Sequence, residues 1–135
     1  MAIQVVAEQE FLVGNPIVLE GPAPAGPFAA VFEDDGDTGY FYALDANEEG
    51  APLQDAVHIY NAANVNDRDK PVRAVIGWSL DNQKVVFLIN GYPHAIFDFA
   101  GKRGYCRTGF PPAAPEGEWS TEGHAWSDSA IDLFQ

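Results

Sequence analysis

The 135-residue sequence contains one cysteine, few basic residues and no long uninterrupted hydrophobic run. Because Cys106 has no second cysteine to pair with, no internal disulfide is expected, which is typical of proteins in a reducing cytosol. No stretch approaches the roughly 18 uncharged apolar residues that a membrane span needs. Glu8 and Glu10 also interrupt the apolar segment near the amino terminus before it could serve as a signal-peptide core. These absences predict a cytoplasmic protein that does not enter a membrane.

Positive charge is scarce. The sequence has 7 lysines and arginines against 20 aspartates and glutamates, a formal net charge of −13 at pH 7, and residues 1–50 contain no lysine or arginine. A negative field repels phosphate groups, so binding to nucleic acid or anionic lipid is not expected. A basic protein or a cation would be attracted instead, although acidity that merely keeps a protein soluble is also common.

Apolar residues are abundant enough for one core: 47% of the chain is hydrophobic and 13% aromatic, which predicts a single globular domain over residues 1–135. Two runs with a period of two, "FAAVFE" and "YFYALD", flank the acidic turn "DDGDTG" and predict a β-hairpin. One face of this hairpin would carry Ala30 and Phe32 in the first run, and one face would carry Tyr40, Tyr42 and Leu44 in the second.

Four more runs predict strands further along the chain: "DAVHIYNA" (55–62), "VRAVIGWS" (72–79), "KVVFLING" (84–91) and "HAIFDFAG" (94–101). Tight turns join the last three runs into an antiparallel meander. A short strand is expected near residues 105–108, and a short helix capped by Ser127 or Asp128 is expected at the carboxyl end. The predicted fold is mainly β, an antiparallel curved sheet or sandwich of about six to eight strands with a short C-terminal helix.

Motifs that would indicate metal or cofactor binding are not found. The acidic stretch around Gly36 does not have the ligand spacing of an EF-hand, so it is interpreted as a solvated turn. His58, His94 and His124 show no metal-binding spacing, and hydrogen-bonded structural roles are expected for them. No phosphate-binding glycine motif is present. No metal or cofactor is therefore predicted.

Cys106 is the best candidate for a nucleophile, because Lys102, Arg103 and Arg107 lie close to it in sequence and positive charge favours a thiolate. No nucleophile elbow of the GxSxG type accompanies it. The three cations are also expected to pair with carboxylates elsewhere in this acidic chain. Because no catalytic constellation emerges, the sequence favours a binding protein over an enzyme.

Several strings resemble a family of small bacterial proteins classed as a domain of unknown function. They are "TGYFYALD", "DAVHIYN", "IGWSLDNQKVVFLINGYPHAIFDF", "GYCRTGFPP" and "HAWSD", and they cover roughly residues 30–128. The resemblance implies a compact cytosolic bacterial protein and carries no functional residues. Small acidic proteins of this kind are also similar in size and charge to the immunity proteins that neutralise antibacterial toxins.

Two functional hypotheses follow. The first is an acidic module that binds a basic protein, such as a nuclease toxin, with Tyr40 and Tyr42 as aromatic anchors if they face outward. Its predicted contact residues are Glu33, Asp34, Asp35, Asp37, Tyr40, Tyr42, Asp45, Glu48 and Glu49. The second is a small-molecule-binding or enzymatic protein whose pocket would contain Trp78, Tyr92, His94, Asp98, Arg103, Cys106 and Arg107. The strand order, the oligomeric state and the identity of the partner are not determined by the sequence.

Overall fold

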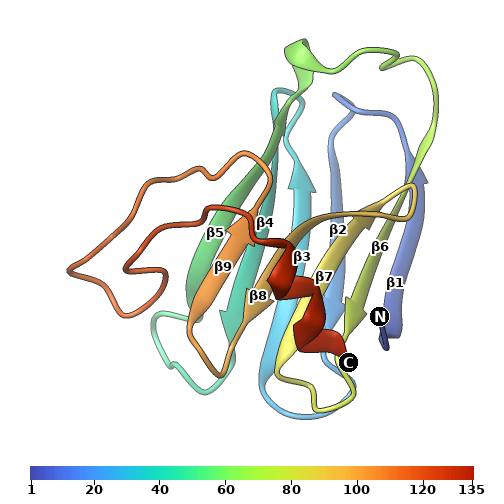
Figure 1. Ribbon diagram of the computed structural model, residues 1–135. Coiled ribbons are helices and arrows are strands. Elements are labelled where there is room, and N and C mark those ends of the chain that lie inside the picture. Colours follow the sequence, from blue (N-terminus) through green and yellow to red (C-terminus); the bar gives the residue numbers. More distant parts are fainter.

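The computed structural model describes residues 1–135 as two antiparallel sheets packed face to face (Figure 1). Sheet A has the order β1 (Gln4–Phe11), β6 (Val72–Trp78), β7 (Lys84–Ile89), β8 (Tyr92–Asp98), β9 (Arg103–Cys106). Sheet B has the order β2 (Ile17–Pro22), β3 (Phe28–Asp34), β4 (Thr38–Asp45), β5 (Leu53–Asn61). Two short 3₁₀ segments complete the fold, η1 (Ala62–Asn64) and η2 (Asp128–Phe134).

The mainly β architecture predicted from the sequence is confirmed, with nine strands in two sheets. The β3–β4 hairpin forms across the acidic turn, with Phe32 opposite Phe41, and β6, β7 and β8 form the expected meander. The short strand after the meander lies at Arg103–Cys106 rather than at residues 105–108. Ser127 caps η2, which is a 3₁₀ segment rather than an α-helix.

The main core lies between the two sheets. Alternate side chains of each strand point inward, and Phe32, Phe41, Phe87 and Phe97 stack there with ring centroids 4.4–5.2 Å apart. Trp78 is fully buried beside them, and its indole N–H donates to the backbone carbonyl of Gly21 on the opposite sheet. This hydrogen bond satisfies the polar atom of a core tryptophan and ties the two layers together.

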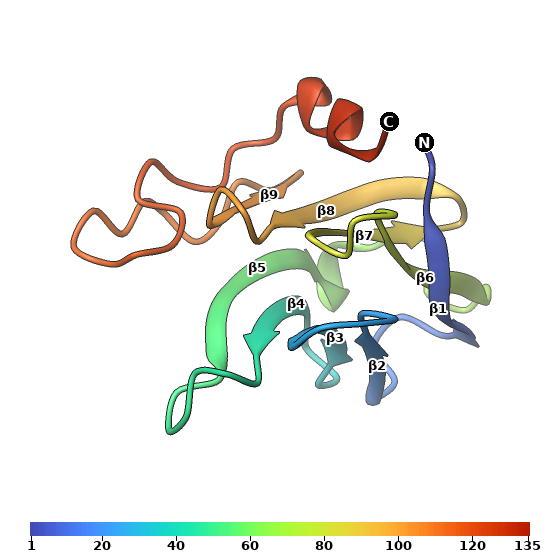
Figure 2. The ribbon, with the colours of Figure 1, turned by 90° about the horizontal axis from the view of Figure 1, so that it is seen from below.

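A second, smaller core lies on the outer side of sheet A. Val86 and Ile96 point away from sheet B and are covered by Ala130 and Phe134 of η2. Figure 2 shows η2 against sheet A, on the side away from sheet B, with both chain termini nearby. No helix in the structure is long and apolar enough to cross a membrane. Because η2 covers only one sheet, the outer side of sheet B has no such covering layer.

Candidate functional site

The outer side of sheet B, here called the acidic face, combines apolar, aromatic and acidic side chains. They alternate along each strand with the side chains of the main core. The acidic face comprises the outward side chains Val18, Glu20, Ala29, Val31, Glu33, Tyr40, Tyr42, Leu44, Ala56 and His58, together with the β3–β4 turn, residues 35–37. Sheet B contains no lysine or arginine, since the first basic residue of the chain is Arg68.

The β3–β4 turn is held by its own carboxylate. Oδ1 of Asp35 accepts hydrogen bonds from the backbone N–H groups of Asp37 and Thr38, both at 2.9 Å. The bond from the Thr38 N–H, followed by the bond from Asp37, holds the pKa of the exposed Asp35 carboxyl below its usual value. Asp37 is also exposed. The turn therefore presents two carboxylates to solvent.

Asp34 does not belong to this surface, although the sequence placed it among the partner contacts. Its side chain is buried with 1% of its surface exposed, because it points inward with Ala30 and Phe32. The carboxylate accepts hydrogen bonds from the N–H groups of Gly14 and Gly36 and from the Tyr60 hydroxyl, at 2.7, 2.8 and 2.6 Å. Asp34 is thus a structural residue that is not available to a partner.

The remaining predicted carboxylates, Asp45, Glu48 and Glu49, lie at the opposite end of sheet B. Asp45 ends β4 and pairs with Phe28, whereas the acidic turn joins the other ends of β3 and β4. The length of β4, at the rise per residue of a β-strand, places these carboxylates about 20 Å from those of the acidic turn. The structure does not bring them together into one cluster, and a partner would have to span the sheet to contact both.

Tyr40 and Tyr42 face outward, as the hypothesis of aromatic anchors requires. Their rings are nearly parallel, with centroids 6.2 Å apart, and the Tyr42 hydroxyl donates to Glu33 at 3.0 Å. Burial, followed by the hydrogen bond to Glu33, raises the pKa of Tyr42 to about 12, so this hydroxyl stays protonated and donating. His58 packs edge-on against Tyr40 at 5.5 Å, and Phe110 packs edge-on against His58 at 6.0 Å. The four rings form a row in the order Tyr42, Tyr40, His58 and Phe110. The sequence did not predict that His58 and Phe110 belong to this surface.

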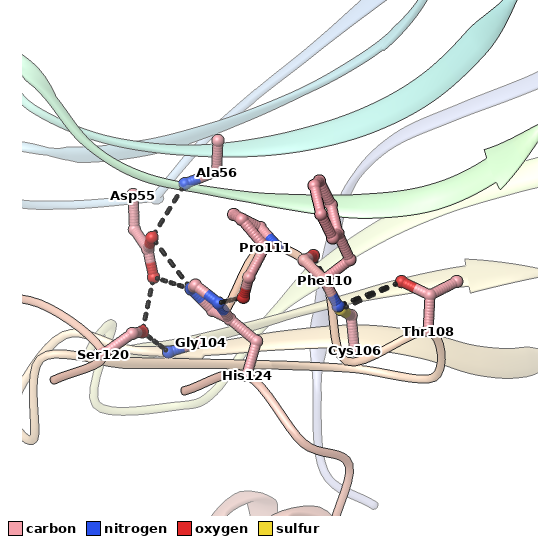
Figure 3. Close-up of polar contacts among 9 residues, drawn as sticks. All are labelled: Asp55, Ala56, Gly104, Cys106, Thr108, Phe110, Pro111, Ser120 and His124. Atoms are coloured by element: carbon pink, nitrogen blue, oxygen red, sulfur yellow. Dashed lines mark hydrogen bonds and ion pairs between the residues drawn. The ribbon is translucent and has the colours of Figure 1, made fainter. Parts of the chain in front are cut away.

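The loop that carries Phe110 is fixed to β5 by a polar network (Figure 3). The Asp55 carboxylate on β5 accepts hydrogen bonds from Ser120 Oγ at 2.6 Å and from His124 Nε2 at 3.0 Å. His124 Nδ1 donates to the Pro111 carbonyl at 2.6 Å, and the Gly104 N–H donates to Ser120 Oγ at 2.8 Å. The network joins β5, β9 and both ends of the long loop that follows β9.

His124 carries a proton on both ring nitrogens, because each nitrogen faces an acceptor with no hydrogen to give. Burial lowers the pKa of His124, but the hydrogen bonds to Asp55 and Pro111 outweigh it and raise the pKa above its usual value. His124 and Asp55 are 3% and 11% exposed. They form a buried ion pair that holds the loop.

Ser120, His124 and Asp55 share the residue types of a hydrolytic triad but not its geometry. In such a triad the serine donates to the imidazole, which in turn donates to the carboxylate. Here the serine and the histidine both donate to the same carboxylate, and Ser120 is 3% exposed. No imidazole nitrogen is left to act as a base toward the serine. The network stabilises the loop and offers no activated nucleophile.

The residues of the predicted alternative pocket lie in separate places. Tyr92, His94 and Arg107 meet on the outer side of sheet A, where the Arg107 guanidinium lies between the rings of Tyr92 and Trp126, at 4.5 and 3.9 Å from their centroids. Burial, followed by the charge of Arg107, lowers the pKa of His94 to about 4. This group is closely packed, and none of the five main hollows on the surface is lined by it.

Of the other four residues of that pocket, Trp78 and Cys106 point inward, and Asp98 and Arg103 pair at the far end of β8 and β9. Trp78 is in the main core, and Asp98 accepts from the N–H of Gly101 in the turn after β8. Cys106 is fully buried and its thiol donates to the Phe110 carbonyl at 3.4 Å, so it is not accessible as a nucleophile. Lys102, Arg103 and Arg107 lie 3.8–3.9 Å from carboxylates of the following loop and of η2, which confirms the predicted pairing.

The family comparison places this chain among bacterial proteins of unknown function. The family model described as an uncharacterized protein conserved in bacteria (DUF2251) matches residues 11–135. The chain belongs to this family. The family resemblance predicted from the sequence strings is thereby confirmed.

A relative from Haemophilus influenzae, described as an uncharacterized protein, is similar to this DUF2251 chain. The two are 41% identical over 95 residues, which are 70% of this chain and 59% of the relative. The chain therefore matches less than two thirds of the relative's own length. No solved structure matches the chain.

Proposed function

We propose that this protein binds a basic protein partner through the acidic face. The observation that carries the proposal is the absence of any ion pair on that side of the molecule. The ion pairs involve Glu8, Asp55, Asp81, Glu118, Glu122 and Asp128. None involves the carboxylates of sheet B and its hairpin turns that face solvent, namely Glu20, Glu33, Asp35, Asp37, Asp45, Glu48 and Glu49. Their charge is left for an external cation.

The charge and the aromatic residues would act at different stages of binding. A field of one sign speeds the encounter with a partner of opposite sign, and it does so less at high salt. Once the two surfaces meet, binding energy concentrates in a few buried aromatic or arginine side chains. Tyr40, Tyr42 and Phe110 are placed for that second role, since the two tyrosines lie beside the acidic turn and Phe110 lies next to Tyr40, on the loop after β9.

Within this proposal, the partner class is a basic bacterial toxin such as a nuclease, and the protein acts as its immunity protein. A nuclease needs a positive cleft to hold phosphate groups, and an acidic face would compete for that cleft. The chemical fit and the acidity of the chain support this class. Co-expression of the partner with and without this protein would test it, because an immunity protein restores the growth of cells that make the toxin.

The proposal is tested by reversing charge on the acidic face without disturbing the fold. Glu20→Lys with Asp37→Lys changes two exposed side chains that make no side-chain hydrogen bond. Glu116→Lys with Glu118→Lys changes the net charge equally on the loop after β9, at positions outside the acidic face, and is the matched control; it removes only the exposed ion pair of Glu118 with Lys102. Each protein is used to capture partners from a lysate of the bacterium that carries the gene, and binding rates are then measured with the purified partner.

We expect a basic partner whose association with the acidic-face variant is about tenfold slower at low salt, with a weaker salt dependence. The control variant should bind at nearly the wild-type rate. Equal slowing by both variants, or a partner without a basic surface, would contradict the proposal.

A further inference from the structure

Two adjoining hollows lie on the acidic face and share Thr38 and Tyr40. The first, about 240 Å³, is lined by Glu33, Asp35, Thr38, Tyr40, Tyr42 and Ala56. The second, about 390 Å³, is lined by Thr38, Tyr40, His58, Asn61, Thr108 and Phe110. Because they share two lining residues, they adjoin, and the two together are called the groove; it follows the row of rings from Tyr42 to Phe110. The groove has no lysine or arginine in its lining.

The groove contains unused acceptors of fixed position. Glu33 uses Oε1 to accept from the Tyr42 hydroxyl, and Asp35 uses Oδ1 to accept from the turn. The second oxygen of each carboxylate accepts no hydrogen bond within the protein. Each carboxylate can thus receive a hydrogen bond from a ligand while its first oxygen keeps the local structure in place.

From these contacts, and resting on the proposed function, we propose that the groove binds an arginine side chain on an exposed loop of the partner. A guanidinium is planar, so it can donate to carboxylates along its edge while its face stacks on an aromatic ring. The hollow between Tyr40, Tyr42 and the two carboxylates provides both kinds of contact. The neighbouring hollow beside His58 and Phe110 accommodates the adjoining backbone of the loop.

The far wall of the groove is held to β5 by hydrogen bonds. The His58 N–H donates to the Phe110 carbonyl at 2.9 Å, and Thr108 Oγ1 donates to the His58 carbonyl at 2.9 Å. The ion pair of Asp55 and His124 fixes the adjoining Pro111. The groove is therefore formed before the partner arrives, which lowers the entropic cost of binding.

The test uses short peptides as probes, because they report on the groove without the rest of the partner. Three capped glycine peptides would carry one central arginine, lysine or citrulline, the last being a neutral analogue of arginine. Binding is followed by NMR at low ionic strength, from the amide signals of Thr38 and Tyr40 and from ring-current shifts of the arginine δ-methylene protons. Glu33→Gln with Asp35→Asn keeps the accepting oxygens, and Glu116→Gln with Glu118→Gln gives the same net charge elsewhere.

We expect the arginine peptide to shift the Thr38 and Tyr40 signals, the lysine peptide to bind more weakly, and the citrulline peptide to bind at least about tenfold more weakly. The Glu33/Asp35 variant should lose about tenfold in affinity, whereas the Glu116/Glu118 variant should match the wild type. Equal losses in both variants, equal binding of citrulline, or shifts located outside the groove would overturn the inference.

The outcome of the peptide test can be distinguished from the outcome of the test of the proposed function. If a basic partner depends on Glu20 and Asp37 but the arginine peptide does not bind in the groove, the partner proposal stands and the arginine site is excluded. If the arginine peptide binds in the groove but no basic partner exists, the site stands and the proposed function fails.

Discussion

Asp34 and Asp35 are neighbours with the same side chain, yet one is buried and the other is in water. The strand alternation that buries Ala30 and Phe32 also turns Asp34 inward, where three donors satisfy its carboxylate. Asp35 follows in the turn and bonds only to local backbone and to Thr38. An ionised group inside a protein needs such donors, since its desolvation is otherwise very costly.

Tyr60→Phe tests how much the buried carboxylate contributes. The Tyr60 hydroxyl donates to Asp34 at 2.6 Å, and burial, followed by this hydrogen bond, raises the pKa of Tyr60. Its loss should lower the free energy of unfolding by about 2 kcal/mol, as expected for a hydrogen bond to a charged group. Urea denaturation measures the change. Tyr42→Phe is the matched control, because its bond to Glu33 is half-exposed and its loss should cost less than about 1 kcal/mol.

The inward position of Asp34 could have been predicted from the sequence, because the residue has the same parity as Ala30 and Phe32. Its acidic neighbours suggested a surface position instead. The pairing of Asp55 with His124 could not be predicted, since 69 residues separate them and no local pattern connects them. A structural, hydrogen-bonded histidine was expected, but its partners depend on how the long loop folds back on β5.

At the scale of elements, turn chemistry decides which strands can be predicted. The β3–β4 hairpin and the β6–β7–β8 meander are joined by short turns, so both the pairing and the period-two pattern are local. β1 pairs with β6, which begins more than sixty residues later, and its pattern is interrupted by outward polar residues. Edge strands of this kind are defined by distant contacts rather than by their own sequence.

Ser120→Ala tests the connection between β5 and the loop after β9. The change removes the donor to Asp55 and the acceptor for the Gly104 N–H, both of which are buried. We expect a loss of about 1–3 kcal/mol in the free energy of unfolding, with faster hydrogen exchange concentrated at Gly104 and in the loop. Thr121→Ala, at the exposed neighbouring position, should change neither measurement. A uniform increase in exchange over both sheets would show that the network does not act locally.

At the scale of the whole molecule, charge is segregated between the two sheets. Sheet B carries no lysine or arginine, and five of the seven lie on sheet A or in the segments next to it. The other two, Arg68 and Lys70, lie in the β5–β6 connection, where Arg68 lines a hollow with Gly36 of the acidic turn. The cations of sheet A are close to carboxylates, whereas the acidic face is unpaired. The sequence composition predicted the imbalance, but only the sheet assignment shows that the strands of sheet B carry no cation.

Two histidines should give stability a maximum near pH 6.5, the usual histidine pKa. The native pKa of His124 is raised, so its contribution is complete below pH 6.5 and is lost as the pH rises through the native pKa. The native pKa of His94 is lowered to about 4. The unfolded state then binds the proton more readily, so stability falls as the pH decreases from 6.5 toward 4.

Denaturation at a series of pH values checks both effects. His124→Gln should flatten the decrease in the free energy of unfolding above pH 6.5, and His94→Gln should flatten the decrease on the acidic side. Hydrogen bonds to Lys84 and Ser79 lower the pKa of Asp81 from 3.8 to about 2. This shift changes stability only below pH 3.8, so its effect does not overlap with the effect of either histidine. An unchanged slope above pH 6.5 in the His124 variant would exclude its buried charge as the cause.

The two ends of the described chain meet beside η2, where the Ala2 N–H donates to the Phe134 carbonyl at 2.9 Å. They lie against sheet A, on the side away from sheet B, as Figure 2 shows. A linker attached at either end would therefore leave the molecule from its covered side. On a sensor chip or a bead, such a tether would orient sheet B toward the solution, where an incoming macromolecule could reach it without obstruction.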